Sequence, residues 1–186
     1  MTDTLSLSPP LEAVPAVQEA LGALGGFAVL GLCAGLGAGD LATTARAVPS
    51  GLLVGTGALL LSGPALVVAH QFLRLEAPPE ALVGALGRAF VQVGRLALGF
   101  SPFVLFFAAT SGLAGWIYVL VLAGIGLLGL SLAGRDLVAA ERGAGAPSLG
   151  RDARMALLTW TWAGLAGLVA LRIGWDVAHF VLLPSL

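Results

Sequence analysis

Residues 113–133 read LAGWIYVLVLAGIGLLGLSLA, and this stretch contains no charged side chain. A helix of about 20 mostly apolar residues is long enough to cross the hydrocarbon core of a bilayer. Four more stretches come close to that length and composition, namely residues 21–38, 51–72, 90–110 and 155–171. Their continuous apolar runs favour helices over the alternating pattern of a membrane β-barrel. The sequence therefore predicts an all-α, polytopic integral membrane protein with about five transmembrane helices in a bundle.

The composition of the whole chain indicates the same class. Hydrophobic residues make up 58% of the chain and charged residues 10%, whereas about a quarter of the residues of a soluble domain are charged. The net charge of −1 gives no sign of a nucleic-acid partner, so the predicted partner is the lipid bilayer. All basic residues are Arg, and together with the abundant Ala, Gly and Leu this is typical of a GC-rich bacterial genome. We therefore expect a protein of the bacterial inner membrane.

Three regions are expected along the chain. Residues 1–20 are predicted to be a cytoplasmic tail that ends in a short amphipathic helix, because apolar residues recur at positions 11, 14 and 17. Residues 21–172 form the helix bundle, and residues 173–186 form a C-terminal interfacial tail that either lies on the membrane or re-enters it. The first region contains Asp3, Glu12 and Glu19 but no basic residue. It is therefore unlike a signal peptide, and the first span is expected to stay in the mature protein.

Polar residues and prolines predict the connections between the spans. Asp40 and Arg46 mark a first loop that Pro49 closes. Pro79 is predicted to begin the third helix, because proline suits the first turn of a helix. Residues 135–154 are the most polar connection, with a flexible linker at 143–148. Aromatic residues near span ends predict belts at the membrane interfaces: Trp116, Tyr118, Trp160, Trp162 and Trp175.

The distribution of Arg predicts the orientation, because cytoplasmic loops carry an excess of basic residues. With five spans, the N-terminal tail, the second connection and the fourth connection share one side of the membrane. The other side holds Arg46 and Arg172. The N-terminus is therefore expected in the cytoplasm and the C-terminus in the periplasm. The arginines on the predicted cytoplasmic side are Arg74, Arg88, Arg95, Arg135, Arg142, Arg151 and Arg154.

Small residues and prolines within the spans predict how the helices pack. Glycines let two helix backbones approach closely, and we expect them to serve contacts within the chain rather than a dimer face. Pro64 and Pro102 lie within the second and third spans and predict helix kinks. The glycines expected at helix contacts are Gly31, Gly35, Gly39, Gly51 and Gly55.

Side chains suited to catalysis or metal binding are scarce in the spans. No Ser/His/Asp set or phosphate-binding glycine loop stands out, so we predict a protein without enzymatic activity. His70 and His179 are the candidates for a haem or pigment ligand, but the predicted topology places them on opposite sides of the membrane. Cys33 is the single cysteine, which excludes a zinc site of several cysteines. No cofactor is therefore expected. Arg172 and Asp176, four residues apart, are expected to pair on one helix face.

Several motifs carry a resemblance to a known family. The run Val48-Pro49-Ser50-Gly51-Leu52, with Thr56 and Pro64, precedes Ser101-Pro102-Phe103 and Phe106-Phe107. This pattern, within residues 27–130, resembles bacterial five-helix membrane proteins of the Yip-like group, although Ala47-Val48 replaces the lysine region of that group. Eukaryotic relatives have a cytosolic N-terminus, five spans and partner-binding roles in membrane traffic. The resemblance therefore implies the same fold and orientation as the Arg distribution.

Three functions remain open on the sequence alone. Many small-residue faces and short loops favour a non-enzymatic membrane subunit or scaffold that packs with other membrane proteins in a larger assembly. A transporter or channel component with proline-kinked helices would need a polar cavity between the second and third spans, where Thr56, Ser62 and Ser101 are available. A pigment- or haem-binding subunit would use His70 or His179 as a single axial ligand.

Overall fold

The computed structural model describes residues 17–39, 41–111, 113–145 and 148–182, and every regular element in these ranges is an α-helix. The prediction of an all-α protein with five long apolar helices is confirmed, because all five are long and apolar enough to cross a membrane. The amphipathic helix predicted from residue 11 lies largely outside the described residues. In chain order the helices are α1 (Val17–Gly37), α2 (Leu41–Phe72), α3 (Pro79–Ser111), α4 (Ala114–Ala144) and α5 (Leu149–Leu182).

The first connection is shorter than the sequence predicted. Helix α2 begins at Leu41, so Pro49 lies inside the helix instead of closing a loop. Proline lacks the backbone N–H that would bond to the carbonyl oxygen four residues earlier, here that of Ala45. Beside it, Ser50 Oγ donates to the Ala47 carbonyl oxygen at 2.6 Å, and the Tyr118 hydroxyl donates to the same oxygen at 3.2 Å. These bonds tie Tyr118 of α4 to α2 next to Pro49, but they do not replace the bond that Ala45 loses.

The polar segment 135–154 is also mostly helical, contrary to the predicted loop. Helix α4 continues to Ala144 and α5 begins at Leu149. The reason is visible in the burial pattern, since Ala133, Leu137 and Glu141 are all buried at four-residue spacing on one helix face. At the other end, α5 runs to Leu182, so residues 173–182 continue the fifth helix and do not re-enter as a separate tail.

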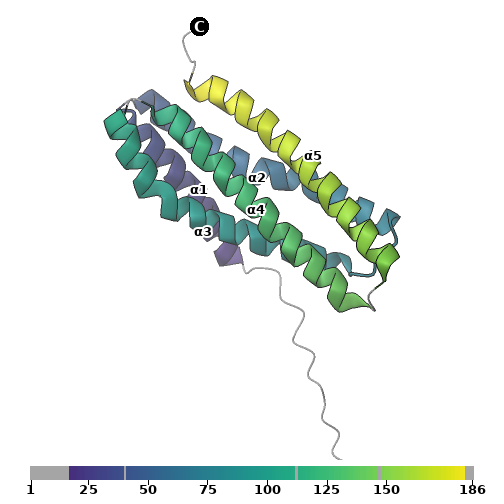
Figure 1. Ribbon diagram of the computed structural model, residues 1–186. Coiled ribbons are helices and arrows are strands. Elements are labelled where there is room, and N and C mark those ends of the chain that lie inside the picture. Colours follow the sequence, from purple (N-terminus) through teal and green to yellow (C-terminus); the bar gives the residue numbers. More distant parts are fainter. Residues whose placement is uncertain (1–16, 40, 112, 146–147, 183–186) are drawn as a thin grey trace, which may run out of the picture.

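The five helices lie side by side and enclose two apolar cores along the length of the bundle (Figure 1). Helix α1 packs against α2 and α3, whereas α5 packs against α2 and α4, so each of them completes a different half. One core contains Leu66, Leu82, Leu137 and Leu158 from α2, α3, α4 and α5. The other contains residues of α1, α3 and α4, namely Phe27, Leu30, Ala97, Val104, Tyr118 and Ile125.

Glycines bring α1 and α2 into close contact. A Cβ atom at Gly31 would collide with the Ala47 backbone of α2, and one at Gly35 would collide with Thr44. On α2, a Cβ atom at Gly51 would lie 2.7 Å from the Phe27 carbonyl oxygen, and one at Gly55 would lie 2.7 Å from the Phe27 ring. The partners of these four glycines all lie within the chain. Such close approach is the usual reason for small residues at helix contacts.

Gly39 does not take part in these contacts. A Cβ atom there would meet nothing within 4 Å, and the residue has a φ of +72°. Glycine adopts this left-handed conformation without strain, which is why it commonly ends a helix. Gly39 therefore ends the turn after α1 and is not a packing residue.

Pro64 and Pro102 lie inside α2 and α3, and both helices are continuous through them. Two residues before Pro64, the carbonyl oxygen of Ser62 accepts a hydrogen bond from Trp162 Nε1 of α5 at 3.1 Å. This bond ties α5 to the proline-containing part of α2. The kinks expected at the two prolines stay a prediction.

The predicted aromatic belts are partly wrong. Tyr118 and Trp162 are 2% and 5% exposed, and their polar atoms bond to α2 backbone oxygens inside the bundle. Trp116, Trp160 and Trp175 are exposed. A buried Tyr or Trp needs a partner for its polar atom, and α2 supplies that partner in both cases.

Replacing Trp162 by Phe is expected to lower the free energy of unfolding by about 1 kcal/mol, because the buried bond to the Ser62 oxygen is lost. The measurement is thermal unfolding of the purified protein in detergent. Trp160→Phe is the matched control, since Trp160 lies two residues away and is exposed. Equal unfolding temperatures for the two variants would contradict a stabilising role of this bond.

Candidate functional site: a polar clamp at one end of the bundle

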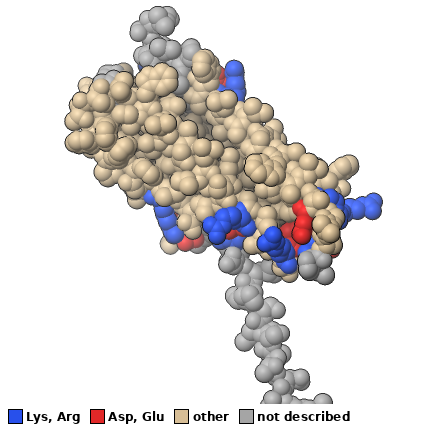
Figure 2. All heavy atoms as spheres, viewed as in Figure 1, with Lys and Arg blue, Asp and Glu red and all other residues tan. Residues whose placement is uncertain are grey.

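Charged side chains gather along one side of the molecule, next to a broad uncharged surface (Figure 2). The end of α2, the start of α3, the end of α4 and the start of α5 meet at one end of the bundle (Figure 1). Polar side chains link the two connections there. We call the set of His70, Glu76, Glu141 and Arg151 the polar clamp, and of these four only Glu76 is exposed, at 54%.

Glu141 lies at the centre of the polar clamp. Its side chain is 3% exposed, and Oε2 lies 3.2 Å from His70 Nε2, whose side chain is 2% exposed. The same carboxylate accepts hydrogen bonds from the backbone N–H groups of Glu76 and Ala77, both at 2.9 Å. Helix α4 thus supplies an acceptor to α2 and to the α2–α3 connection. A buried carboxylate is tolerated only with several donors of this kind.

Arg151 forms the second part of the polar clamp. Its side chain is 3% exposed, and Nη1 donates to Glu76 Oε2 at 3.0 Å. Nη2 donates to the Gly145 carbonyl oxygen at 2.8 Å. A Cβ atom at position 145 would collide with the Glu76 carboxylate, so glycine leaves the room that this ion pair occupies. Arg151 therefore joins the start of α5 to both connections.

Arg154, one turn further along α5, adds an exposed contact to the same region. Its Nη1 donates to the Leu73 carbonyl oxygen at 2.8 Å, and its Nε donates to the Gly150 carbonyl oxygen at 3.2 Å. Leu73 directly follows the last residue of α2. Carbonyl groups at a helix end lack partners within the helix, and the guanidinium of Arg154 supplies one.

The polar clamp holds the α2–α3 and α4–α5 connections against each other. Its hydrogen bonds join the two connections, although Arg151 Nε is buried without a hydrogen-bond partner. No nucleophile with a neighbouring base is among the four residues. The arrangement supports a structural role, since the buried carboxylate of Glu141 and the buried guanidinium of Arg151 depend on these contacts to compensate their charges. It therefore sets the relative position of four helix ends.

The two histidines are not brought together. His70 Nε2 lies 3.2 Å from Glu141 Oε2, so this ring nitrogen already has a partner within the chain. His179 falls in the last part of α5, where the side chains are not described. Among the described residues, no group of three or more His, Cys, Asp or Glu side chains is placed to hold a metal ion.

Ion pairs also join described residues outside the polar clamp. Arg88 and Asp136 join α3 to α4 at 3.2 Å, and Arg95 and Glu19 join α3 to α1 at 3.3 Å. The predicted pair of Arg172 and Asp176 on α5 is confirmed, at 3.3 Å. All three are partly exposed, and exposed pairs of this kind contribute little to stability.

The hydroxyl groups proposed for a polar path are engaged in their own helices. Thr56, Ser62 and Ser101 donate to the carbonyl oxygens of Leu52, Ala58 and Ala97, each four residues earlier, at 2.7, 2.6 and 2.9 Å. These bonds satisfy the hydroxyl donors locally. They give no support to a polar cavity between α2 and α3.

The sequence reasoning placed Glu76, Glu141 and Arg151 in polar connections and assigned them no contacts. For Glu141 a signal was present, because it continues the four-residue spacing of Ala133 and Leu137 on the buried face of α4. For Glu76 and Arg151 there was no such signal, since their pairing depends on how two connections meet.

The chain matches no known protein family, no curated protein and no solved structure. The resemblance to the Yip-like group therefore stays a prediction.

Proposed function

We propose that the protein is a non-enzymatic integral membrane subunit that packs with other membrane proteins in a larger assembly. The five long apolar helices support insertion into a membrane. The gathering of charged side chains on one side of the bundle suits a protein with one strongly charged membrane face (Figure 2). If the N-terminus lies in the cytoplasm, as the distribution of Arg predicts, the polar clamp lies at the cytoplasmic end of the bundle.

The observation that carries the proposal is a glycine on the outer face of α5. Gly164 is exposed, and a Cβ atom there would meet nothing within 4 Å. By contrast, Gly31, Gly35, Gly51 and Gly55 are filled by neighbouring helices of the same chain. Large exposed side chains flank Gly164 one turn before and after it on the same face, namely Trp160 and Leu168. A small residue between large ones forms a notch into which a helix of another protein fits.

The test is purification from native membranes in a gentle detergent, followed by mass spectrometry of the proteins that co-purify. We expect one or more partner subunits in stoichiometric amounts with the wild-type chain. Gly164→Leu fills the notch and is expected to remove them. Gly99→Leu is the matched control, because Gly99 is also exposed on a helix with nothing within 4 Å of its Cβ position.

Two outcomes would contradict the subunit proposal. One is a wild-type protein that purifies alone, and the other is equal loss of partners from both glycine variants. An odd number of spans also places the two termini on opposite sides of the membrane. Reporter fusions at each terminus test the proposed orientation, with a cytoplasmic N-terminus and a periplasmic C-terminus as the expected result. The relation to the Yip-like group belongs to the same proposal.

A further inference from the structure

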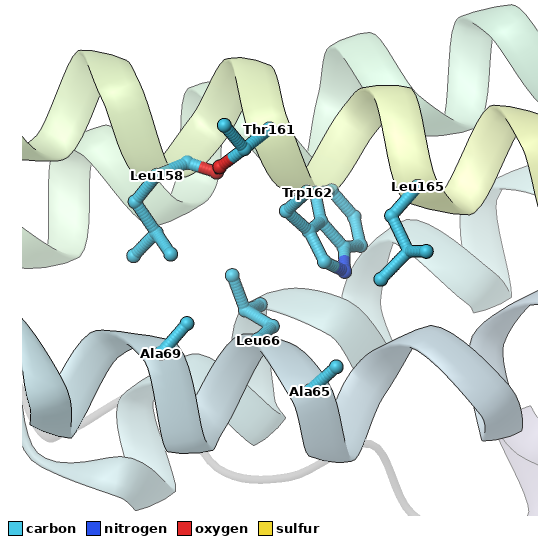
Figure 3. A pocket seen from close by; sticks show the side chains of 7 residues that line it. All are labelled: Ala65, Leu66, Ala69, Leu158, Thr161, Trp162 and Leu165. Carbon is cyan, nitrogen blue, oxygen red and sulfur yellow. The ribbon is translucent and has the colours of Figure 1, made fainter.

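A shallow groove runs between α2 and α5 on the outside of the bundle (Figure 3). Its volume is about 180 Å³, somewhat larger than a buried apolar cavity of about 150 Å³ that accepts benzene. Ala65 and Ala69 form the α2 side, and Leu158, Thr161 and Leu165 line the α5 side. Ala65, Thr161 and Leu165 are exposed, so the groove opens to the surroundings of the protein.

The groove presents an almost entirely apolar surface. The Thr161 hydroxyl donates to the carbonyl oxygens of Leu157 and Leu158 on its own helix. Trp162, whose side chain also lies in the wall, donates its N–H group to the Ser62 oxygen. Both polar groups are therefore satisfied by the protein, and the groove suits a hydrocarbon chain.

One end of the groove carries a positive charge. Residues 154, 158, 161 and 165 are spaced by four, three and four positions, so Arg154 lies on the same face of α5 as the lining residues. On α2 and directly after its end, residues 65, 69 and 73 are spaced by four, and Arg154 Nη1 bonds to the Leu73 oxygen at 2.8 Å. The guanidinium thus lies across the end of the groove. Arginine has five N–H donors; two of those of Arg154 bond to backbone oxygens.

We propose that this groove binds one anionic phospholipid, with an acyl chain between α2 and α5 and the phosphate on the guanidinium of Arg154. Arginine recognises phosphate oxygens through paired hydrogen bonds, and the combination of an apolar groove with a cation at its end matches the two parts of such a lipid. The inference rests on the proposal that the chain spans a membrane. It adds a ligand and a binding site that the subunit proposal does not require.

The first test is native mass spectrometry of the detergent-purified protein mixed with equal amounts of phosphatidylglycerol and phosphatidylcholine. We expect about five-fold more bound phosphatidylglycerol than phosphatidylcholine, the ratio that one arginine near an anionic headgroup provides. Arg154→Gln is expected to remove this preference. Ala65→Phe fills the groove without changing the charge. It is expected to reduce the binding of phosphatidylglycerol as much as Arg154→Gln does.

Arg142→Gln is the matched control, because Arg142 is exposed at the end of α4 and does not lie on the groove. It is expected to keep the preference for phosphatidylglycerol. Equal binding of the two lipids by the wild-type chain would overturn the proposal. So would equal losses in Arg154→Gln and Arg142→Gln, since the preference would then reflect general attraction between charges.

A second test identifies the occupant in native membranes. The exposed Thr161 is replaced by a photoreactive residue, Thr161→benzoylphenylalanine, and the membranes are irradiated. An adduct with the mass of a phospholipid supports the proposal, whereas an adduct with a second copy of the chain or with another protein overturns it. Incorporation of the wild-type chain into lipid nanodiscs is measured separately. If the chain inserts but shows no lipid preference, the lipid site fails and the proposed membrane insertion stands.

Discussion

Glu141→Ala is expected to destabilise the protein by about 3–5 kcal/mol, because three buried groups lose their common acceptor and each loss costs about 1–3 kcal/mol. His70 would lose the acceptor 3.2 Å from its Nε2. The backbone N–H groups of Glu76 and Ala77 would also lose theirs. The measurement is thermal or denaturant unfolding of the purified protein in detergent. We expect a large drop in the unfolding temperature, or failure to obtain folded protein.

The control for this prediction is Glu80→Ala. Glu80 is exposed in the first turn of α3, and exposed substitutions of this kind usually change stability by less than about 0.5 kcal/mol. Glu141→Gln is a milder variant that keeps a side-chain oxygen as acceptor. It remains informative if the alanine variant does not fold. A Glu141→Ala protein as stable as Glu80→Ala would show that the polar clamp does not stabilise the bundle.

A double-mutant cycle separates two contributions to the stability lost in Glu141→Ala, namely the contact with His70 and the hydrogen bonds from the backbone of residues 76 and 77. His70→Ala removes the contact between Nε2 and the Glu141 carboxylate but leaves the backbone donors of residues 76 and 77 bonded to Glu141. We therefore expect the combined loss in His70→Ala, Glu141→Ala to be smaller than the sum of the single losses, because the His70–Glu141 contact is counted twice in that sum. Additive losses would indicate that His70 and Glu141 do not interact.

The positions of the helices could be predicted from the sequence because hydrophobicity along the chain reports them directly. The ends of α4 and α5 at the polar clamp could not be predicted in this way, because Glu141 and Arg151 are polar residues that become buried only when two connections meet. Charged residues near a predicted span end look the same in sequence whether they face water or another helix. The start of α2 was missed because Pro49 was expected to close a loop, whereas the helix continues through it.

The glycine pattern shows a similar limit. The four-residue spacing correctly indicated Gly31 and Gly35 as residues that approach another backbone, but Gly39 at the same spacing has a positive φ and ends the turn after α1. Sequence spacing alone does not state where a helix stops. Gly26 and Gly94 were not singled out together, because their contact depends on the packing of α1 along α3.

Gly26→Val is expected to prevent correct packing of α1. A Cβ atom at Gly26 would collide with the Gly94 carbonyl oxygen and lie 3.5 Å from its Cα atom. These are backbone atoms, so no change of side-chain rotamer relieves the collision, and the two helices must separate. Overpacking against movable side chains already costs about 1–3 kcal/mol, and we expect a larger loss here. The measurement is the yield of monodisperse protein in gel filtration, followed by thermal unfolding.

Gly25→Val is the matched control, because Gly25 is the neighbouring residue of α1 and a Cβ atom there would meet nothing within 4 Å. Both variants place the same β-branched residue in the same helix, so the difference between them reports the contact with α3. Equal yields and equal unfolding temperatures would show that α1 and α3 are not in close contact at this point.

The contact between α1 and α3 can also be tested from Gly94 on α3. A Cβ atom at Gly94 would collide with the Ala23 backbone of α1, so Gly94→Ala and Gly26→Ala each force α1 and α3 apart. Once one methyl group has separated the helices, the second enters space that is already open. We therefore expect the double variant to lose less stability than the sum of the single losses, as residues that share one contact do.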